Sequence, residues 1–200
     1  SVGRSFSSGA DLNWMRRVAG ASQGENKRDA MALAALMRTL SELRKPTIAR
    51  VQGPAYGGGV GLIACCDVAV ATVNATFALT EAKLGLIPAV ISPYVVAAIG
   101  AKAARRYFLT AEKIEAADAW RLGLLHELAQ DEADLDEKVG QIVDAFLACG
   151  PVAQAECKAL IRAVANRPVT SELIQDTAER IARIRSSPEG MEGVTAFLEK

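Results

Sequence analysis

The chain has 200 residues, of which 50% are apolar, and its 23 lysines and arginines equal its 23 acidic residues. This length suits one domain, or one domain with an appendage, and the apolar share is enough for a sizeable core. The balanced charge offers no basic surface for nucleic acid or an anionic membrane, and no apolar run reaches the ~18 residues of a membrane span. We expect a cytoplasmic protein whose partners include neither nucleic acid nor a membrane.

The first part of the chain predicts two helices separated by a loop. A turn of small residues precedes a helix expected over residues 12–18, with Asp11 near its N-terminus. The polar stretch 21–29 predicts a mobile loop. Apolar residues at helical spacing then predict a helix over 30–43, which Pro46 ends.

A glycine-rich turn follows the first predicted strand. Residues 47–51 predict a buried strand, and the apolar run 60–66 predicts a short buried helix. Between them stand Gly57, Gly58 and Gly59. Glycines let backbone approach a ligand closely, and the N-terminus of a helix favours negative charge. We therefore expect this turn to face a phosphate or a developing oxyanion.

Two phosphate-binding motifs were compared with this turn. A P-loop is excluded because Lys and Ser or Thr do not follow the last glycine. The dinucleotide fingerprint G-x-G-x-x-A matches at Gly59, Gly61 and Ala64, but residues 54–56 separate the strand from the glycines. Dinucleotide binding stays a minor alternative, beside a tight turn that binds no ligand.

The strand-like segments 67–71 and 75–79 come next. The order strand, helix, strand indicates an α/β architecture. Glu81 follows the second of these strands among apolar residues. Such surroundings should raise the pKa of its carboxyl, which suits proton transfer near neutral pH.

The second half predicts mostly helices. Thr110 could cap one of them, and residues 124–128 predict a short strand. The expected helices span residues 101–109, 111–122, 135–149, 152–165, 171–184 and 189–200. The fifth carries an apolar stripe that a small domain alone does not bury, formed by Ile174, Ala178, Ile181 and Ile184.

The residue types that bind metals or act as nucleophiles are sparse. The one histidine, His126, has no nucleophilic neighbour, which argues against Ser-His-Asp or Cys-His hydrolysis. The four cysteines, at positions 65, 66, 149 and 157, have neither metal-ligand nor disulfide spacing. We expect reduced thiols and no metal site.

Several segments together resemble the enoyl-CoA hydratase/isomerase (crotonase) family. They are FSSGADL at 6–12, KPTIA at 45–49, the stretch 53–67, FALTE at 77–81 with GLIP at 85–88, and ADAWRLGL at 117–124. The resemblance implies an α/β crotonase-like superhelix of stacked ββα turns over residues 1–130. It also implies a C-terminal helical trimerisation region over 131–200, and a homotrimer or hexamer.

The resemblance further implies a site for an acyl-CoA thioester, with no metal or redox cofactor. The backbone N–H groups of Ala10 and Gly58 would form an oxyanion hole for the thioester oxygen, and Glu81 would be the general acid and base. The residues expected to contact substrate are Ser8, Gly9, Ala10, Asp11, Leu12, Asn13, Gly57, Gly58 and Gly61. The implied activity is addition of water to an enoyl-CoA, or its removal, in fatty-acid or leucine catabolism.

Two positions depart from the family pattern. Many hydratases hold a second glutamate where this chain has Gly61, so Glu81 alone must serve as acid and base. Residues 88–94 stand where many members have a glycine-rich run. Together with residues 59–62, that segment is similar to bacterial methylglutaconyl-CoA hydratases of leucine breakdown.

Family members also carry a β/α segment ahead of the position of Phe6, so we expect a truncated chain here. Two alternatives stay open beside the hydratase. One is an enoyl-CoA double-bond isomerase that uses Glu81 alone. The other is a catalytically degenerate or RNA-binding homologue.

Overall fold

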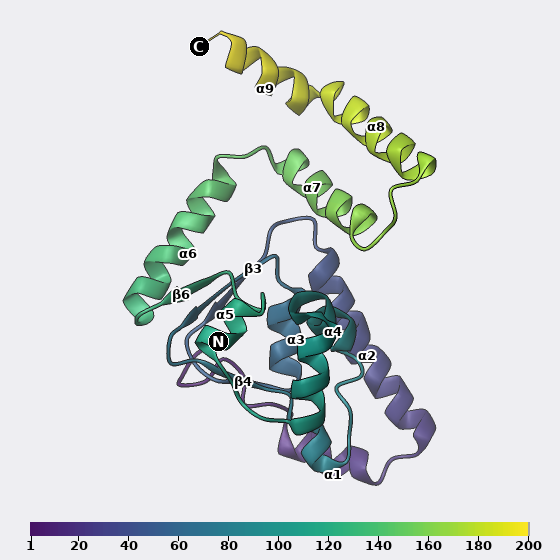
Figure 1. Cartoon of the computed structure of the whole chain (residues 1–200), viewed down its shortest axis with the longest axis vertical. Coiled ribbons are helices and arrows are strands. Elements are labelled where there is room, and N and C mark those ends of the chain that lie inside the picture. Colours follow the sequence, from purple (N-terminus) through teal and green to yellow (C-terminus); the bar gives the residue numbers. More distant parts are fainter. Residues whose placement is uncertain (200) are drawn as a thin grey trace. The chain divides into compact units, whose positions relative to one another are not determined.

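The computed structural model describes residues 1–199, which divide into two compact units. The first comprises Ser1–Ser41 and Thr47–Gln141, and the second comprises Glu42–Pro46 and Ile142–Lys200. The first unit holds the strands and the second is helical (Figure 1). The predicted α/β architecture is therefore confirmed, while the division at residue 130 stays a prediction.

Two small sheets form the centre of the first unit. One has the order β1 (Ile48–Val51), β3 (Val68–Thr72), β6 (Glu127–Ala129), and all its neighbours are parallel. The other has the order β2 (Ala55–Tyr56), β4 (Thr76–Ala78), β5 (Ile114–Glu115), with β2 parallel and β5 antiparallel to β4. The four predicted strands correspond to β1, β3, β4 and β6, and the two-residue strands β2 and β5 were missed.

Buried apolar side chains explain why these strands form. Val51, Val70 and Phe77 are fully buried, as expected for parallel strands covered on both faces. A polar clamp fixes where β1 and β3 start: Asp67 Oδ2 accepts hydrogen bonds from the N–H (2.7 Å) and hydroxyl (2.8 Å) of Thr47. The clamp thus fixes the register of β1 against β3, and with it the position of the turn that follows β1.

The helices of this unit surround the sheets. They are α1 (Leu12–Ala19), α2 (Gln23–Glu42, whose last residue lies in the second unit), α3 (Gly58–Cys65), the 3-10 helix η1 (Thr80–Leu84), α4 (Ser92–Thr110), α5 (Ala116–Arg121) and the first part of α6 (Glu132–Leu147). Helix α3 packs beside α4, as Figure 1 shows. Asp11 caps α1 as expected, because its Oδ1 accepts the N–H of Trp14 at 2.7 Å.

The mobile loop predicted over residues 21–29 is wrong, because α2 already begins at Gln23. The cause is a capping box formed by Ser22 and Glu25. Glu25 Oε2 accepts the N–H (2.8 Å) and the hydroxyl (2.7 Å) of Ser22, and Ser22 Oγ accepts the N–H of Glu25 at 3.3 Å. The helix therefore includes the polar stretch and continues without a break.

Two predicted helix boundaries are also wrong. Helix α4 starts at Ser92 rather than 101, with one non-helical residue, Gly100 (φ 74°), inside it. Thr110 is the last residue of α4 and does not cap a helix over 111–122; its hydroxyl donates to the carbonyl of Arg106 at 2.9 Å. Ala111 then turns left-handed (φ 49°), and β5 precedes the shorter α5.

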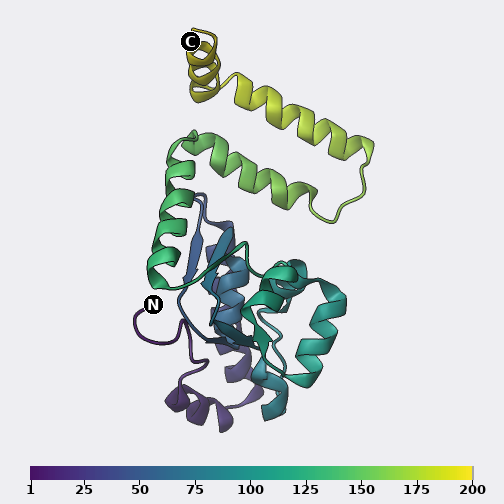
Figure 2. The same cartoon turned by 60° about the vertical axis from the view of Figure 1, so that its left-hand side comes forward.

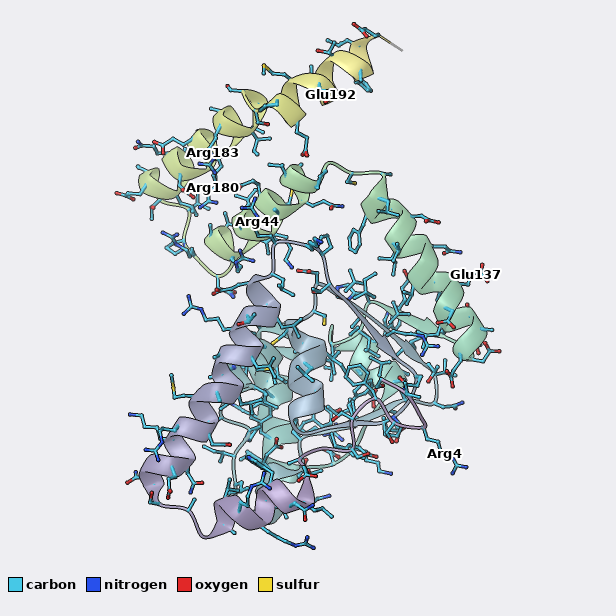
Figure 3. The ribbon with its side chains drawn as sticks, turned by 180° about the vertical axis from the view of Figure 1, so that it is seen from behind. Arg4, Arg44, Glu137, Arg180, Arg183 and Glu192 are labelled. Atoms are coloured by element: carbon cyan, nitrogen blue, oxygen red, sulfur yellow. The ribbon has the colours of Figure 1, made fainter. Side chains whose placement is uncertain are left out.

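The second unit contains α7 (Pro151–Val164), α8 (Ser171–Arg185) and α9 (Pro188–Leu198), which follow one another as separate helices in Figure 2. Arg183, labelled on α8 in Figure 3, donates to Glu156 of α7 at 3.0 Å. These helices match the predicted ones to within a few residues. The predicted end of the last helix, Lys200, lies outside the described residues.

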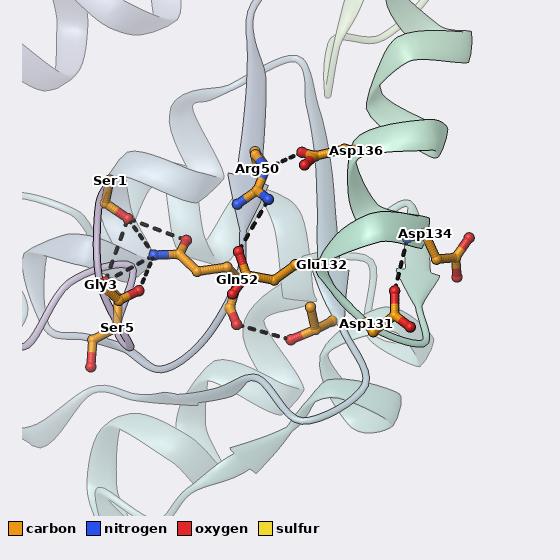
Figure 4. Close-up of polar contacts among 10 residues, drawn as sticks. Ser1, Gly3, Ser5, Arg50, Gln52, Asp131, Glu132, Asp134 and Asp136 are labelled. Carbon is orange, nitrogen blue, oxygen red and sulfur yellow. Dashed lines mark hydrogen bonds and ion pairs between the residues drawn. The ribbon is translucent and has the colours of Figure 1, made fainter.

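The N-terminal segment is tied to the sheet by the side chain of Gln52 (Figure 4). Its Nε2 donates to the carbonyls of Gly3 (3.0 Å) and Ser5 (3.2 Å). On the same strand end, Arg50 donates to Asp136 of α6. The hydrogen bonds of Gln52 thus anchor residues 3–5 beside the end of β1. Within residues 1–199, no helix is both long and apolar enough to cross a membrane.

Candidate active site

The candidate site is built around the start of α3. Gly57, the residue before the helix, has φ 52° and ψ −122°, a conformation that only glycine adopts without strain. Its N–H donates to the carbonyl of Ala78 in β4 at 2.9 Å. The N–H of Val60 donates to the carbonyl of Gly57 at 3.0 Å. Because glycine has no side chain to cap the helix, the N–H groups of the two residues before Val60, Gly58 and Gly59, can donate hydrogen bonds to a ligand.

The N-terminal segment lies directly beside this helix start. Ser7 donates its N–H to the carbonyl of Pro54 (3.1 Å) and accepts the N–H of Tyr56 (3.0 Å), in a parallel bridge to β2. A β-carbon at Gly59 would lie 2.5 Å from Ser7 Cβ, and one at Gly9 would lie 3.9 Å from Tyr56 Cβ. The two turns of small residues predicted from the sequence are therefore neighbours.

The predicted substrate contacts of the first turn lie on the surface. Ser8, Gly9, Ala10, Asp11, Leu12 and Asn13 are all exposed. Ala10 directly precedes Asp11, the cap of α1, so that helix fixes the end of the turn. Convergence of the Ala10 and Gly58 amides on one acceptor stays a prediction.

Glu81 faces the same helix start from η1. A β-carbon at Gly57 would lie 3.2 Å from Glu81 Oε1. Glu81 Oε2 is buried and has no hydrogen-bond partner among residues 1–199. Burial raises the pKa of this carboxyl, and a hydrogen bond to its own backbone opposes the rise less strongly. A half-buried carboxylate with a raised pKa is typical of a general acid or base.

Gly61 is buried one turn further along α3. A β-carbon there would lie 2.7 Å from Ile91 Cβ and 3.4 Å from Met37 Cε. Residue 61 therefore faces apolar side chains and has no room for a carboxylate. In the described part of the chain, no group of three or more His, Cys, Asp and Glu residues could hold a metal ion.

His126 forms hydrogen bonds with strand β3 of the sheet. Its Nδ1 accepts the N–H of Ala69 at 3.1 Å, and its own N–H donates to the carbonyl of Ala69 at 2.8 Å. Cys65 is buried, and burial raises the pKa of its thiol to about 12. Both side chains therefore lie in structural positions.

Comparison with known proteins identifies the family. The chain matches the family described as enoyl-CoA hydratase/isomerase over residues 1–200. It belongs to the enoyl-CoA hydratase/isomerase family. The resemblance seen in the sequence and the predicted enzyme class, an enoyl-CoA hydratase-type enzyme, are thereby confirmed.

Individual members of the enoyl-CoA hydratase/isomerase family support the assignment. A solved enoyl-CoA hydratase of Shewanella pealeana is 48% identical, with a TM-score of 0.96 over 99% of this chain and 74% of that one. A crotonyl-CoA hydratase of Syntrophomonas wolfei is 32% identical over 98% of this chain and 74% of its own length. An enoyl-CoA hydratase of Alternaria alternata is 40% identical over 68% of this chain, but only 46% of its own length is covered.

The solved family members also confirm the crotonase-like fold class. The sequence predicted a role for Glu81 and for both turns of small residues, which the structure places close together. It missed Ile91, whose side chain fills the space beside Gly61. The sequence does show that both residue 61 and the segment 88–94 depart from the family pattern. It does not show that these two departures are in contact.

Proposed function

We propose that this family member is a hydro-lyase that adds water across the 2,3-double bond of an enoyl-CoA, or removes it in reverse. The observation that carries the proposal is the buried carboxylate oxygen of Glu81 beside the start of α3, which has no hydrogen-bond partner among the described residues. An acid/base group and a set of free N–H groups are the two parts that this reaction needs. The names of the hydratase relatives support the same activity.

The amides of Ala10 and Gly58 bind the thioester oxygen in this proposal. When water attacks the β-carbon, electrons move through the double bond and negative charge collects on that oxygen. Fixed N–H donors stabilise this charge without reorganising, and loss of one such donor costs about 3–4 kcal/mol of transition-state stabilisation. The adjacent turns at Ser7–Ala10 and Gly57–Gly59 support the arrangement.

Glu81 handles both protons. As an ionised base it takes a proton from water, whose oxygen forms the new bond to the β-carbon. It then returns that proton to the α-carbon, which discharges the enolate. A raised pKa makes the first step easier, because the protonated carboxyl that forms when Glu81 takes the proton from water is less costly in a buried position. No step requires a metal or redox cofactor, since coenzyme A belongs to the substrate.

The structure of residue 61 favours a second candidate activity. Because Gly61 leaves no room for a second carboxylate, Glu81 is the one predicted acid/base group. One carboxylate suffices to move a double bond: Glu81 would take a proton from C2 of a 3-enoyl-CoA and deliver it to C4. The chain would then be an enoyl-CoA isomerase.

The identity of the acyl group, the cellular location and the assembly are more specific proposals. A branched, carboxylated acyl group such as methylglutaconyl, and hence leucine breakdown, is supported by the segments 59–62 and 88–94 alone. The proposed location is the cytoplasm. A trimer or hexamer through the second unit is supported by the stripe on α8, where Ile174 is 58% and Ile181 is 47% exposed in the single chain.

One spectroscopic experiment tests the activity and separates the two candidates. The full-length protein is incubated with crotonyl-CoA and, separately, with a 3-enoyl-CoA, and the absorbance of the conjugated thioester is followed. A hydratase removes this absorbance from crotonyl-CoA, and an isomerase creates it from the 3-enoyl-CoA. If neither substrate changes, and a branched enoyl-CoA does not change either, both candidate functions are wrong.

A further inference from the structure

Gly61 and Ile91 form a close pair beside the candidate site. Gly61 lies three residues after Gly58, so both face the same side of α3, one turn apart. The β-carbon direction of Gly61 points at the side chain of Ile91, with 2.7 Å to its Cβ and a still shorter approach to its Cγ2. Any side chain at position 61 would need the space that Ile91 occupies.

Ile91 is held firmly in this place. It directly precedes α4, where its carbonyl accepts the N–H groups of Tyr94 and Val95, both at 3.1 Å. Its side chain is only 3% exposed, and a β-branched side chain has few alternative rotamers. The side chain therefore cannot swing away without disturbing the start of α4.

Position 61 is also close to where the reacting carbons must lie. In the proposed binding mode the thioester oxygen lies at the Gly58 amide, which puts the α- and β-carbons next to the first turn of α3, on the side that Glu81 faces. In that mode an acyl chain that extends along the same helix face would meet the backbone of Gly61 and, behind it, Ile91.

We propose that Ile91 is the residue that determines which acyl groups the site accepts. Its side chain fills the volume behind Gly61 with apolar atoms and so limits the bulk of the acyl group beyond the β-carbon. This inference rests on the proposed function, because it assumes that an acyl-CoA binds with its carbonyl at Gly58. Ile91 acts by shape and takes no part in proton transfer, which Glu81 performs.

The test compares two substrates that differ only in bulk. Crotonyl-CoA and 4-methyl-2-pentenoyl-CoA share the reacting carbons, and the second carries two more methyl groups at C4. The kcat/KM ratio of the bulkier to the smaller substrate is measured for the full-length wild type, Ile91→Val and Ile91→Ala. One methylene in an apolar pocket changes such a ratio by about 10- to 200-fold, so Ile91→Ala should raise it at least tenfold, with Ile91→Val between.

Ile99 provides the matched control. It is a buried isoleucine inside α4, 6% exposed, and it lies eight residues after Ile91, or ~12 Å further along the helix. Ile99→Val and Ile99→Ala should leave the substrate ratio unchanged. The proposal is overturned if folded Ile91 variants keep the ratio within threefold of wild type, or if the Ile99 variants shift it equally.

Binding measurements keep the inference separate from the proposed function. Butanoyl-CoA and 4-methylpentanoyl-CoA, the saturated analogues, are titrated calorimetrically against the same variants. If the wild type turns over neither enoyl-CoA nor 3-enoyl-CoA, the proposed function fails. The role of Ile91 is still supported if Ile91→Val binds the bulkier analogue more tightly, relative to the smaller one, than the wild type does. An unmoved Kd ratio contradicts that role.

A double-mutant cycle tests the contact itself. Gly61→Ala should lower the melting temperature, because its β-carbon would collide with Ile91. In the Gly61→Ala, Ile91→Ala double variant the freed space accepts the added methyl group, so the two losses should be clearly less than additive. Strict additivity would show that the two side chains do not share this space.

Discussion

The carboxylate of Glu81 rests against the backbone of Gly57, so closely that a β-carbon at Gly57 would lie 3.2 Å from Glu81 Oε1. Gly57 also makes the turn into α3 with a backbone conformation reserved for glycine. One residue thus shapes the predicted oxyanion turn and lies against the predicted acid/base group. A substitution at Gly57 should therefore affect both the turn and the Glu81 carboxylate.

Gly57→Ala should therefore impair stability and activity together. Forcing another residue into such a conformation costs about 1–3 kcal/mol of unfolding free energy, and the new methyl group would displace the Glu81 carboxylate. Denaturant unfolding and kcat/KM measure the two effects. As the control, Gly140→Ala in α6 meets open space and should stabilise the protein by up to about 1 kcal/mol. Full activity in Gly57→Ala would contradict the predicted site geometry.

The pH dependence of activity should report the raised pKa of Glu81. As a base, Glu81 must be ionised, and burial disfavours the ionised form. The acidic limb of kcat/KM should therefore fall at a pH above the ordinary glutamate range. An acidic limb at the ordinary glutamate pKa would contradict a buried catalytic carboxylate.

Unfolding experiments check the same raised pKa through stability. The contribution of Glu81 to stability should fall as pH rises, whereas its activity as a base should increase. Because the folded-state pKa of Glu81 lies above the unfolded one, its stabilising contribution is present below the unfolded pKa and is lost as pH rises through the folded pKa. Glu81→Gln removes the buried charge, so it should unfold at higher denaturant concentration than wild type at pH 7. The difference should disappear at pH 3, where wild-type Glu81 is protonated. No difference at pH 7 would contradict the raised pKa.

The sequence predicted most of the fold because its signals are local. The buried strands and the glycine turn were recognised from apolar runs and glycines. The loop predicted at 21–29 was wrong because the prediction relied on the polar composition of this stretch. Ser22 and Glu25 instead exchange hydrogen bonds in a capping box, and α2 starts there. Strands β2 and β5, with two residues each, carry no periodicity that a sequence pattern can show.

The candidate site was only partly predictable for a different reason. Glu81 and the glycines stand out by residue type, so the sequence alone could predict a role for them. The role of Ile91 depends on a contact between residues thirty positions apart in sequence, Gly61 and Ile91. Side-chain packing between α3 and the start of α4 sets this contact, and no local pattern encodes it.

Assembly should depend on the exposed stripe of α8. An Asp at Ile174 and at Ile181 would bring two charges into the proposed subunit contact, which a buried interface does not tolerate. Light scattering after size exclusion should show a trimer or hexamer for the wild type and smaller species for the Ile174→Asp, Ile181→Asp variant. Val169→Asp, at a position 80% exposed outside the stripe, is the control. A monomeric wild type at micromolar concentration would contradict the proposed assembly.

The second unit should be sensitive to loss of Glu189. Its Oε2 accepts the N–H of Val152 at 3.0 Å and its Oε1 that of Ala153 at 2.8 Å, so it caps α7 from the first turn of α9. Removing a helix-capping acceptor costs about 1 kcal/mol, and Glu189→Ala should lower the unfolding free energy by that amount. Glu192→Ala, at the exposed position labelled in Figure 3, should have little effect. Equal losses in both variants would contradict the capping role.

The most direct test of the central claim is turnover by Glu81→Gln in the full-length protein. Glutamine keeps the shape of the side chain but cannot accept a proton, so kcat for an enoyl-CoA should fall by about 10²–10⁴-fold. The Kd of a saturated acyl-CoA should change by less than about threefold, since the N–H donors are untouched. The exposed Glu115 gives the control, Glu115→Gln, which should keep wild-type kcat. If Glu81→Gln turns over the enoyl-CoA as fast as wild type, Glu81 is not the acid/base group and the proposed mechanism is wrong.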